Sequence, residues 1–288
     1  VHCGDVVDQG ASPAQWQVAD AAMKTLETAG VPYSILAGNH DVMNQSATDM
    51  QRNLASEPFV SWFGTARAKK ESSYLAGDDS GFHQAHTFSY QGKKFMVIAV
   101  SWNMSMEAVT WARNLIKANP TLPVILSSHD ALYIDSDAVT AHDSDYGQFM
   151  WDQLVKDNDQ IFMIVNGHNH GSAHKIRMND LGHPVLQVVV DYQMAYQGGN
   201  GYMRLFEFDL TNNLIKGLTF SPWVPEKPQN TLNQFDRAIL SEPNNEYTVE
   251  MNFAQRFAGF QPDFNAGTAD RKVPLTDTVR GMILADYQ

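Results

Sequence analysis

Apolar and polar residues recur along the chain with two different periods. Helical spacing over residues 12–30, 105–118 and 146–156 predicts three amphipathic helices. The first begins at Ser12-Pro13, where Gln15 could complete a capping box, and it ends at Gly30. In the second, we expect Met106, Val109, Leu115 and Ile116 to form the inner face.

Short apolar runs bounded by turn residues predict the strands. They lie at residues 33–37, 86–90, 95–100, 123–127, 161–165, 173–178, 184–191, 202–208 and 214–220. The second and third of these are separated by residues 91–94 and are expected to form a hairpin. Strands that first alternate with helices and then follow one another favour an α/β fold. We expect a layered α/β/β/α sandwich of two sheets flanked by helices.

The domain organisation follows from where this pattern weakens. Residues 1–220 carry it and are predicted to form one catalytic domain, with a functional insertion at residues 41–81 where periodicity is low. The chain opens on residues that look like the end of a strand, so we expect a first strand upstream. Four prolines interrupt residues 221–288, which we interpret as a C-terminal extension.

Composition and charge restrict the possible partners. The chain has 288 residues, and its 43% hydrophobic content is enough to bury a core. A formal net charge of −12 opposes sequence-independent binding to nucleic acid, unless bound cations offset the charge locally. The longest apolar run, at residues 95–100, is too short to span a membrane. The single cysteine, Cys3, excludes an internal disulfide and a cysteine-rich zinc site.

Four polar segments each follow a buried apolar run. They are Gly4-Asp5-Val6-Val7-Asp8, Gly38-Asn39-His40-Asp41, Ser128-His129-Asp130 and Gly167-His168-Asn169-His170. Because ligands of open α/β sheets bind beyond the carboxyl ends of strands, we expect these turns to converge on one crevice. Carboxylate, amide and imidazole groups together suit Mn, Fe or Zn.

In this order and spacing, the four segments resemble the calcineurin-like metallophosphoesterases. The matching patterns are Gly-Asp-x-x-Asp, Gly-Asn-His-Asp, a lone His and Gly-His-x-His. The resemblance extends over residues 1–220. The stretches at residues 191–193 and 198–201 look like those of bacterial, often exported members, which favours a periplasmic or secreted location.

The resemblance implies a binuclear metal centre. By position, Asp5 would bridge two ions, Asn39, His129 and His168 would complete one of them, and His170 would belong to the other. In the family, an Asp-x-His pair on the preceding strand supplies the remaining ligands of the second ion. This chain does not contain that motif.

The resemblance also implies the reaction. Two ions about 3.5–4 Å apart would activate a bridging hydroxide, which would attack a phosphate mono- or diester of a small molecule. His40 would face the leaving-group oxygen as a proton donor or charge stabiliser, and Asp41 would hold its ring. We expect Asp8, Asp191 and Gln193 to orient the site from behind.

Each of these residues also has an ordinary structural interpretation. Gly-Asp and Gly-Asn are common turn signals, and an isolated histidine is more often a hydrogen-bonded structural residue than a ligand. We assign that structural role to the histidines outside the motifs, His83, His86, His142, His174 and His183.

Two other functions remain open at this stage. A non-catalytic or impaired module would bind one metal ion or phosphate without hydrolysis, because the second metal site is short of ligands. A nuclease would need a basic track, and no Lys/Arg cluster lies near the four motifs. About two ions per chain with turnover would indicate the enzyme, whereas about one ion without turnover would indicate the module.

Overall fold

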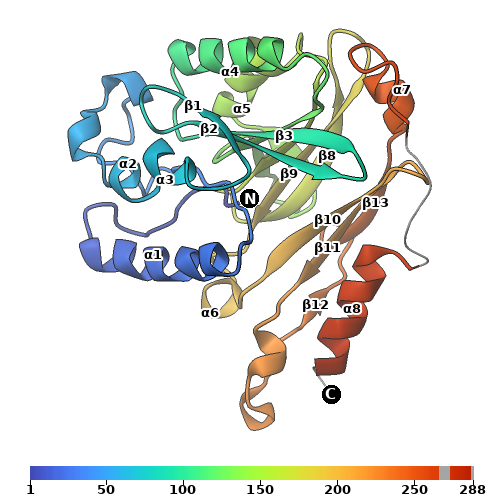
Figure 1. Cartoon of the computed structure of the whole chain (residues 1–288). Helices are drawn as coiled ribbons and strands as arrows, with labels where there is room; N and C mark the ends of the chain where they lie inside the picture. Colours follow the sequence, from blue (N-terminus) through green and yellow to red (C-terminus); the bar gives the residue numbers. More distant parts are fainter. Residues whose placement is uncertain (266–272, 287–288) are drawn as a thin grey trace. The chain divides into compact units, whose positions relative to one another are not determined.

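The computed structural model describes residues 1–265 and 273–286, which form two compact units (Figure 1). The first unit comprises residues 1–133, 142–169 and 175–189. The second comprises residues 134–141 and 170–174 together with the described residues from 190 onward. Within the described part of the chain, no helix combines the length and apolar character needed to cross a bilayer.

A seven-stranded mixed sheet forms the centre of the fold. Its strands, in spatial order, are β1 (Tyr74–Gly77), β2 (Gln84–Tyr90), β3 (Lys93–Val100), β4 (Val124–Ser128), β7 (Ile161–Asn166), β9 (Pro184–Asp191) and β8 (Gly171–Met178). Strands β3, β4, β7 and β9 are parallel to one another, whereas β1, β2 and β3 pair antiparallel. Gln91 and Gly92 both have positive φ, as the two-residue turn of the β2–β3 hairpin requires.

Two hydrophobic clusters bury the inner faces of the helices of the first unit. One contains the inner faces of α4 (Met106–Ala118), α5 (Asp145–Met150) and the π-helical turn Trp151–Val155, packed on β3, β4 and β7. The other joins α1 (Pro13–Thr28) to the insertion after residue 40. Figure 1 shows α1 and α4 on opposite sides of the sheet. The predicted α/β class is therefore confirmed.

The insertion at residues 41–81 contains short elements and no long one. It consists of 3-10 turns at Asp49–Gln51 and Leu54–Ser56, the helices α2 (Pro58–Phe63) and α3 (Thr65–Ala68), and strand β1. Phe59 and Phe63 are fully buried against Trp16 of α1, so these aromatic residues pack beneath the loop.

The second unit is built on a smaller antiparallel sheet. Its strands are β10 (Met203–Asp209), β11 (Leu214–Phe220), β12 (Ile239–Leu240) and β13 (Glu246–Glu250). Both β12 and β13 pair with β11, so residues beyond 220 complete this sheet. The other elements of this unit are α6 (Tyr196–Gly199), 3-10 turns at Val224–Glu226 and Gln229–Thr231, α7 (Phe253–Phe257) and α8 (Leu275–Asp286). Strands β5 (Leu132–Ile134) and β6 (Ala141–Asp143) form a separate two-stranded sheet. The division into a catalytic domain at residues 1–220 and a C-terminal extension at residues 221–288 stays a prediction.

Three local features differ from the sequence-based expectation. Ser12 makes no side-chain cap, and Gln15 Oε1 accepts a hydrogen bond from the backbone N–H of Gln9 at 2.8 Å instead of from that of Ser12. Residues 33–37 form only one parallel bridge, between His2 and Ile35, and the carbonyl of Ile35 accepts the Gln84 amide at 2.6 Å.

The third difference is in α4. Met106 is the first residue of this helix and is 49% exposed, so it does not belong to the inner face. Val109 and Ile116 are buried as expected.

Candidate metal centre

The parallel strands bring three chemically important loops to one edge of the large sheet. Strands β3, β4 and β7 are hydrogen-bonded neighbours that run in the same direction, so their carboxyl ends share an edge. Trp102 follows β3, His129 follows β4 and His168 follows β7. The order of strands in the sheet therefore places these three aromatic rings together.

His129 lies at the centre of this group and is 1% exposed. Its Nδ1 atom is 2.7 Å from the backbone carbonyl oxygen of Cys3. Because a carbonyl can only accept a hydrogen bond, Nδ1 carries the proton, and in the neutral ring Nε2 presents a lone pair. That atom faces Asn39 Oδ1 at 2.9 Å, His168 Nδ1 at 3.1 Å and Asp5 Oδ1 at 3.3 Å.

This donor set fits a divalent metal ion. Three atoms lie 2.9–3.3 Å from His129 Nε2, and two of them, Asn39 Oδ1 and Asp5 Oδ1, turn lone pairs toward it, which is repulsive unless a proton or a metal ion lies among them. Two imidazole nitrogens, one carboxylate oxygen and one amide oxygen suit Mn, Fe or Zn. Such a set would hold an ion at ligand distances of about 2.0–2.2 Å.

Backbone geometry allows this close approach. Asp5 and His168 both have left-handed φ angles, 50° and 61°, which turn their side chains toward the group. Gly38 lies against both Asp5 and His129, and a Cβ at this position would lie 2.7 Å from His129 Cε1 and closer still to Asp5. Glycine at position 38 is therefore required by the space available.

The charges of Asp5 and His129 stabilise each other. Burial lowers the pKa of His129, but its hydrogen bond to Asp5 and the charge of that carboxylate outweigh burial and raise the pKa overall. Burial likewise opposes ionisation of Asp5, whereas His129 and the backbone N–H of His40 bring the pKa of the carboxyl below its ordinary value. A proton on Nε2 of His129 thus competes with a metal ion for the same position.

His40 lies beside this group, with 42% of its side chain exposed. Its Nδ1 atom donates to the backbone carbonyl oxygen of Asp8 at 2.8 Å. Nε2 is therefore the ring nitrogen that remains for proton transfer.

Asp41 has different partners from the one expected. Its carboxylate is fully buried and accepts hydrogen bonds from the backbone N–H groups of Val6 and Val7 at 3.0 Å and of Gly38 at 2.7 Å. Burial raises the pKa of Asp41 to about 7, although these three hydrogen bonds favour the charged form. Asp41 thus joins the turn of Asp5 to the turn of Asn39.

His170 belongs to the second unit. There its exposed ring accepts a hydrogen bond from the Gln193 side-chain amide at 3.1 Å. The backbone N–H of Gln193 in turn donates to Asp191 at 3.0 Å. Asp5, Asn39, His129 and His168 all lie in the first unit.

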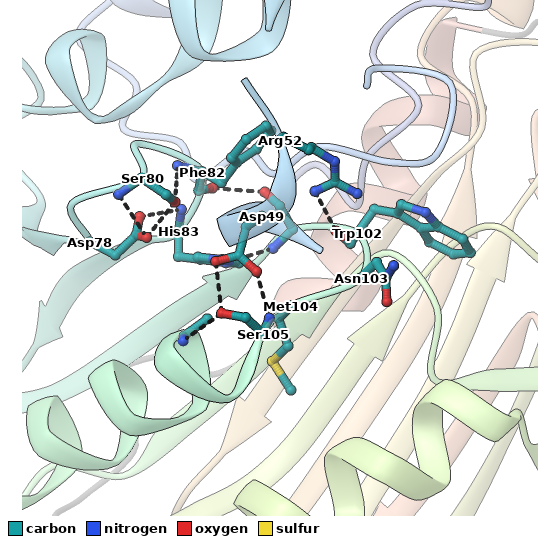
Figure 2. Close-up of polar contacts among 12 residues, drawn as sticks. Asp49, Arg52, Asp78, Ser80, Phe82, His83, Trp102, Asn103, Met104 and Ser105 are labelled. Carbon is teal, nitrogen blue, oxygen red and sulfur yellow. Dashed lines mark hydrogen bonds and ion pairs between the residues drawn. The ribbon is translucent and has the colours of Figure 1, made fainter. Parts of the chain in front are cut away.

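A second group of possible ligands lies in the first unit and does not fit a metal ion. Asp49, Asp78 and His83 approach one another as shown in Figure 2. The backbone N–H of Ser101 donates to His83 Nδ1 at 3.1 Å, so the ring proton is on Nε2, which points to Asp49 Oδ2 at 3.4 Å. Without a lone pair on Nε2, this histidine serves as the partner of Asp49, in agreement with its expected structural role.

His86 also has a structural environment. Its ring lies between Ser73 Oγ at 2.9 Å and Gln84 Oε1 at 2.8 Å. Because the Gln84 oxygen can only accept, Nε2 donates to it and Nδ1 accepts from the Ser73 hydroxyl. The neutral ring is therefore fully hydrogen-bonded.

Comparison with known proteins places this arrangement in a family. The profile of the calcineurin-like phosphoesterases matches residues 1–172, which include Asp5, Asn39, His129 and His168. The chain belongs to the calcineurin-like phosphoesterase family. As a member, it has a fold associated with metal-dependent hydrolysis of phosphate esters.

Two curated proteins are similar in sequence. The uncharacterised protein YvnB of Bacillus subtilis is 28% identical over 269 residues, which is 91% of this chain and 20% of that protein. A probable cyclic nucleotide phosphodiesterase of Psychrobacter arcticus is 25% identical over 174 residues, which is 59% of this chain and 56% of that protein. The chain therefore spans about a fifth of the first relative and just over half of the second.

Among solved structures, the NAD nucleotidase of Haemophilus influenzae aligns with 99% of this chain and 50% of its own. The two share 12% sequence identity and superpose with a TM-score of 0.37.

Proposed function

We propose that this protein hydrolyses the phosphate mono- or diester of a small molecule with the help of two metal ions, drawn from Mn, Fe and Zn. The observation that carries the proposal is the convergence of Asp5, Asn39 and His168 on the Nε2 atom of His129. Family membership supports the same class of chemistry. The similarity to the probable cyclic nucleotide phosphodiesterase of Psychrobacter arcticus supports a diester among the substrates.

The proposed ligands divide between two ions. Asp5, Asn39, His129 and His168 would hold the first ion, and Asp5 would also serve the second. When bound, such ions polarise phosphoryl oxygens and lower the pKa of a coordinated water to near neutrality. In a chain with a net charge of −12, they also provide the local positive charge that an anionic substrate needs.

His40 is the residue that would handle the leaving group. Because Nδ1–H is held by the carbonyl oxygen of Asp8, the imidazolium form of His40 would present the proton on Nε2 to the departing oxygen. Asp41 would act indirectly by tying the turn that carries Asn39 and His40 to the backbone of Val6 and Val7. The half-exposed position of His40 leaves room for a leaving group.

Metal analysis combined with two artificial substrates tests the proposal. The protein is purified, its metal content is measured, and hydrolysis of p-nitrophenyl phosphate and of bis(p-nitrophenyl) phosphate is followed. We expect about two ions per chain and turnover that a chelator abolishes and added Mn²⁺ restores. About one ion and no turnover of either substrate would instead indicate a non-catalytic metal- or phosphate-binding module.

A variant of the proposed bridging ligand provides the matching control. Asp5→Ala is expected to lose both metal and turnover, because the carboxylate would serve both ions. The surface variant Asp157→Ala, which breaks only an exposed pair with Arg113, should keep both. Full metal content in Asp5→Ala would contradict the proposed ligand set.

A further inference from the structure

The indole ring of Trp102 lies against two of the proposed ligands. Its centroid is 5.7 Å from that of His129, with the planes at 75°, and 5.1 Å from that of His168, with the planes at 46°. The backbone N–H of Trp102 also donates to the carbonyl of Ala37 at 2.8 Å, two residues before Asn39. Trp102 thus contacts the rings of two proposed ligands with its side chain, and its backbone contacts the turn that carries Asn39.

A strap formed by residues 44–52 of the insertion holds the loop that carries Trp102. Arg52 of the strap is 6% exposed and donates to three backbone carbonyls. Two belong to the strap itself, Asn44 at 3.3 Å and Ala47 at 2.5 Å, and the third is that of Trp102 at 3.1 Å. Figure 2 shows Arg52 directed at Trp102. A buried guanidinium therefore links the insertion to this position.

Side chains of the loop complete the attachment. Trp102 Nε1 donates to the carbonyl of Gln45 at 2.8 Å, and the Asn103 amide donates to that of Ala47 at 3.0 Å. The Asp49 carboxylate accepts the backbone N–H of Ser105 at 2.5 Å and its hydroxyl at 3.0 Å. These contacts connect the strap to the loop at both ends, so Trp102 has little freedom to move.

Tyr146 restrains the indole further. Its ring lies 6.2 Å from that of Trp102 with the planes at 29°, and its hydroxyl accepts the backbone N–H of Met104 at 3.0 Å. The indole is therefore positioned by Tyr146, by the strap and by the two histidines.

We propose that Trp102 is a positioning residue of the metal centre. Its ring restricts rotation of the His129 and His168 imidazoles, so that their ligand nitrogens stay directed at one point, and the strap holds Trp102 in place. Aromatic contacts of this geometry favour particular ring orientations. The groups that surround metal ligands typically change metal affinity about 10–100-fold when they are removed. The inference rests on the proposed function, because it needs a metal at this site.

Titration of the metal-free protein with Co²⁺ tests the inference without measuring activity. The visible absorption of bound Co²⁺ reports ligand geometry, and its intensity gives the affinity. In Trp102→Leu, the new side chain fills much of the same volume without a ring. We expect the affinity for Co²⁺ to fall roughly tenfold and the visible absorption band of bound Co²⁺ to change. The half-exposed Trp223 of the second unit provides the matched control Trp223→Phe, which should match the wild type.

Two further variants keep the test decisive if Trp102→Leu does not fold. Arg52→Lys keeps Trp102 and the positive charge but cannot reach three carbonyls, so Co²⁺ binding should weaken several-fold. In Trp102→Phe, the Co²⁺-induced quenching of tryptophan fluorescence should be lost, whereas Trp223→Phe should retain it. The inference would be overturned if Trp102→Leu or Arg52→Lys bound Co²⁺ with the affinity and absorption band of the wild type. It would also be overturned if Co²⁺ quenched the fluorescence of Trp102→Phe as strongly as that of the wild type.

The outcomes separate this inference from the proposed function. If the wild type takes up no Co²⁺, the metal site itself is absent and the proposed function fails. If the wild type binds Co²⁺ and hydrolyses phosphate esters while the Trp102 variants are unchanged, only the positioning role is wrong.

Discussion

The ring of His40 is hydrogen-bonded to the main chain of Asp8, whose carbonyl oxygen lies 2.8 Å from Nδ1. The Asp8 carboxylate is 3.8 Å from the same atom and is mostly exposed. The orientation of His40 therefore depends on the path of the backbone at Asp8 more than on the charge of its side chain.

Replacing His40 should separate catalysis from metal binding. We expect His40→Ala to keep its metal and to lose about 10²–10⁴ in kcat, because a proton donor is removed and no ligand is. Asp8→Asn retains the backbone carbonyl and should stay within a few-fold of the wild type. Metal analysis and steady-state hydrolysis of both p-nitrophenyl substrates measure the difference, and unchanged turnover in His40→Ala would remove this residue from the mechanism.

Position 38 should accept no residue larger than glycine. In Gly38→Ala, the new Cβ would meet Asp5 and would lie 2.7 Å from His129 Cε1, so both proposed ligands would have to shift. We expect a marked loss of bound metal, measured by elemental analysis. Gly281→Ala is the control, because nothing lies within 4 Å of its new Cβ and alanine favours the helix by up to about 1 kcal/mol. Equal metal content in the two variants would contradict the close packing at Gly38.

Asp41→Asn should destabilise the protein. One carboxylate oxygen accepts from Val7 and the other from Val6 and Gly38, and an amide nitrogen cannot accept any of these hydrogen bonds. A buried donor without a partner costs about 1–3 kcal/mol, so the free energy of unfolding should fall by at least this amount. Urea denaturation at neutral pH measures the change. A variant as stable as the wild type would show that the turns do not depend on this carboxylate.

His86 should contribute to loss of stability in acid. Burial lowers its pKa from the ordinary value of 6.5 to about 4 in the folded protein, so the unfolded chain binds the proton more readily. Above pH 6.5 the ring is neutral in both states and does not oppose folding. As pH falls from 6.5 toward 4, the unfolded chain takes up the proton first, so the free energy of unfolding decreases by up to about 3 kcal/mol. Urea denaturation of the wild type and of His86→Gln across this range gives the difference in slope. Parallel curves for the two proteins would contradict the assignment.

The strand order explains how much of the site could be predicted from the sequence. Polar segments that follow consecutive buried strands were expected to meet, and Asp5, Asn39, His129 and His168 do lie together. Their role as ligands and that of His170 stay predictions. For His129 and His168 the prediction worked because β4 and β7 are parallel and present their carboxyl ends at one edge. Asp5 and Asn39 instead follow segments that are joined only by the bridge between His2 and Ile35.

The remaining contacts have no signature in the sequence. The partners of His129 Nδ1 and His40 Nδ1 are backbone carbonyls, of Cys3 and Asp8, and any residue type supplies a carbonyl. Asp41 likewise interacts with backbone N–H groups, whereas the family resemblance predicted His40 as its partner. Trp102 follows a buried strand like His129 and His168, but it lies outside the four motifs.

The link between His129 and Cys3 has a practical consequence. Since the main chain supplies the acceptor, position 3 can accommodate other small side chains while the imidazole keeps its tautomer. The single thiol among these 288 residues is thus dispensable for this interaction. A Cys3→Ser version would open the molecule to site-specific labelling through a single engineered cysteine placed elsewhere.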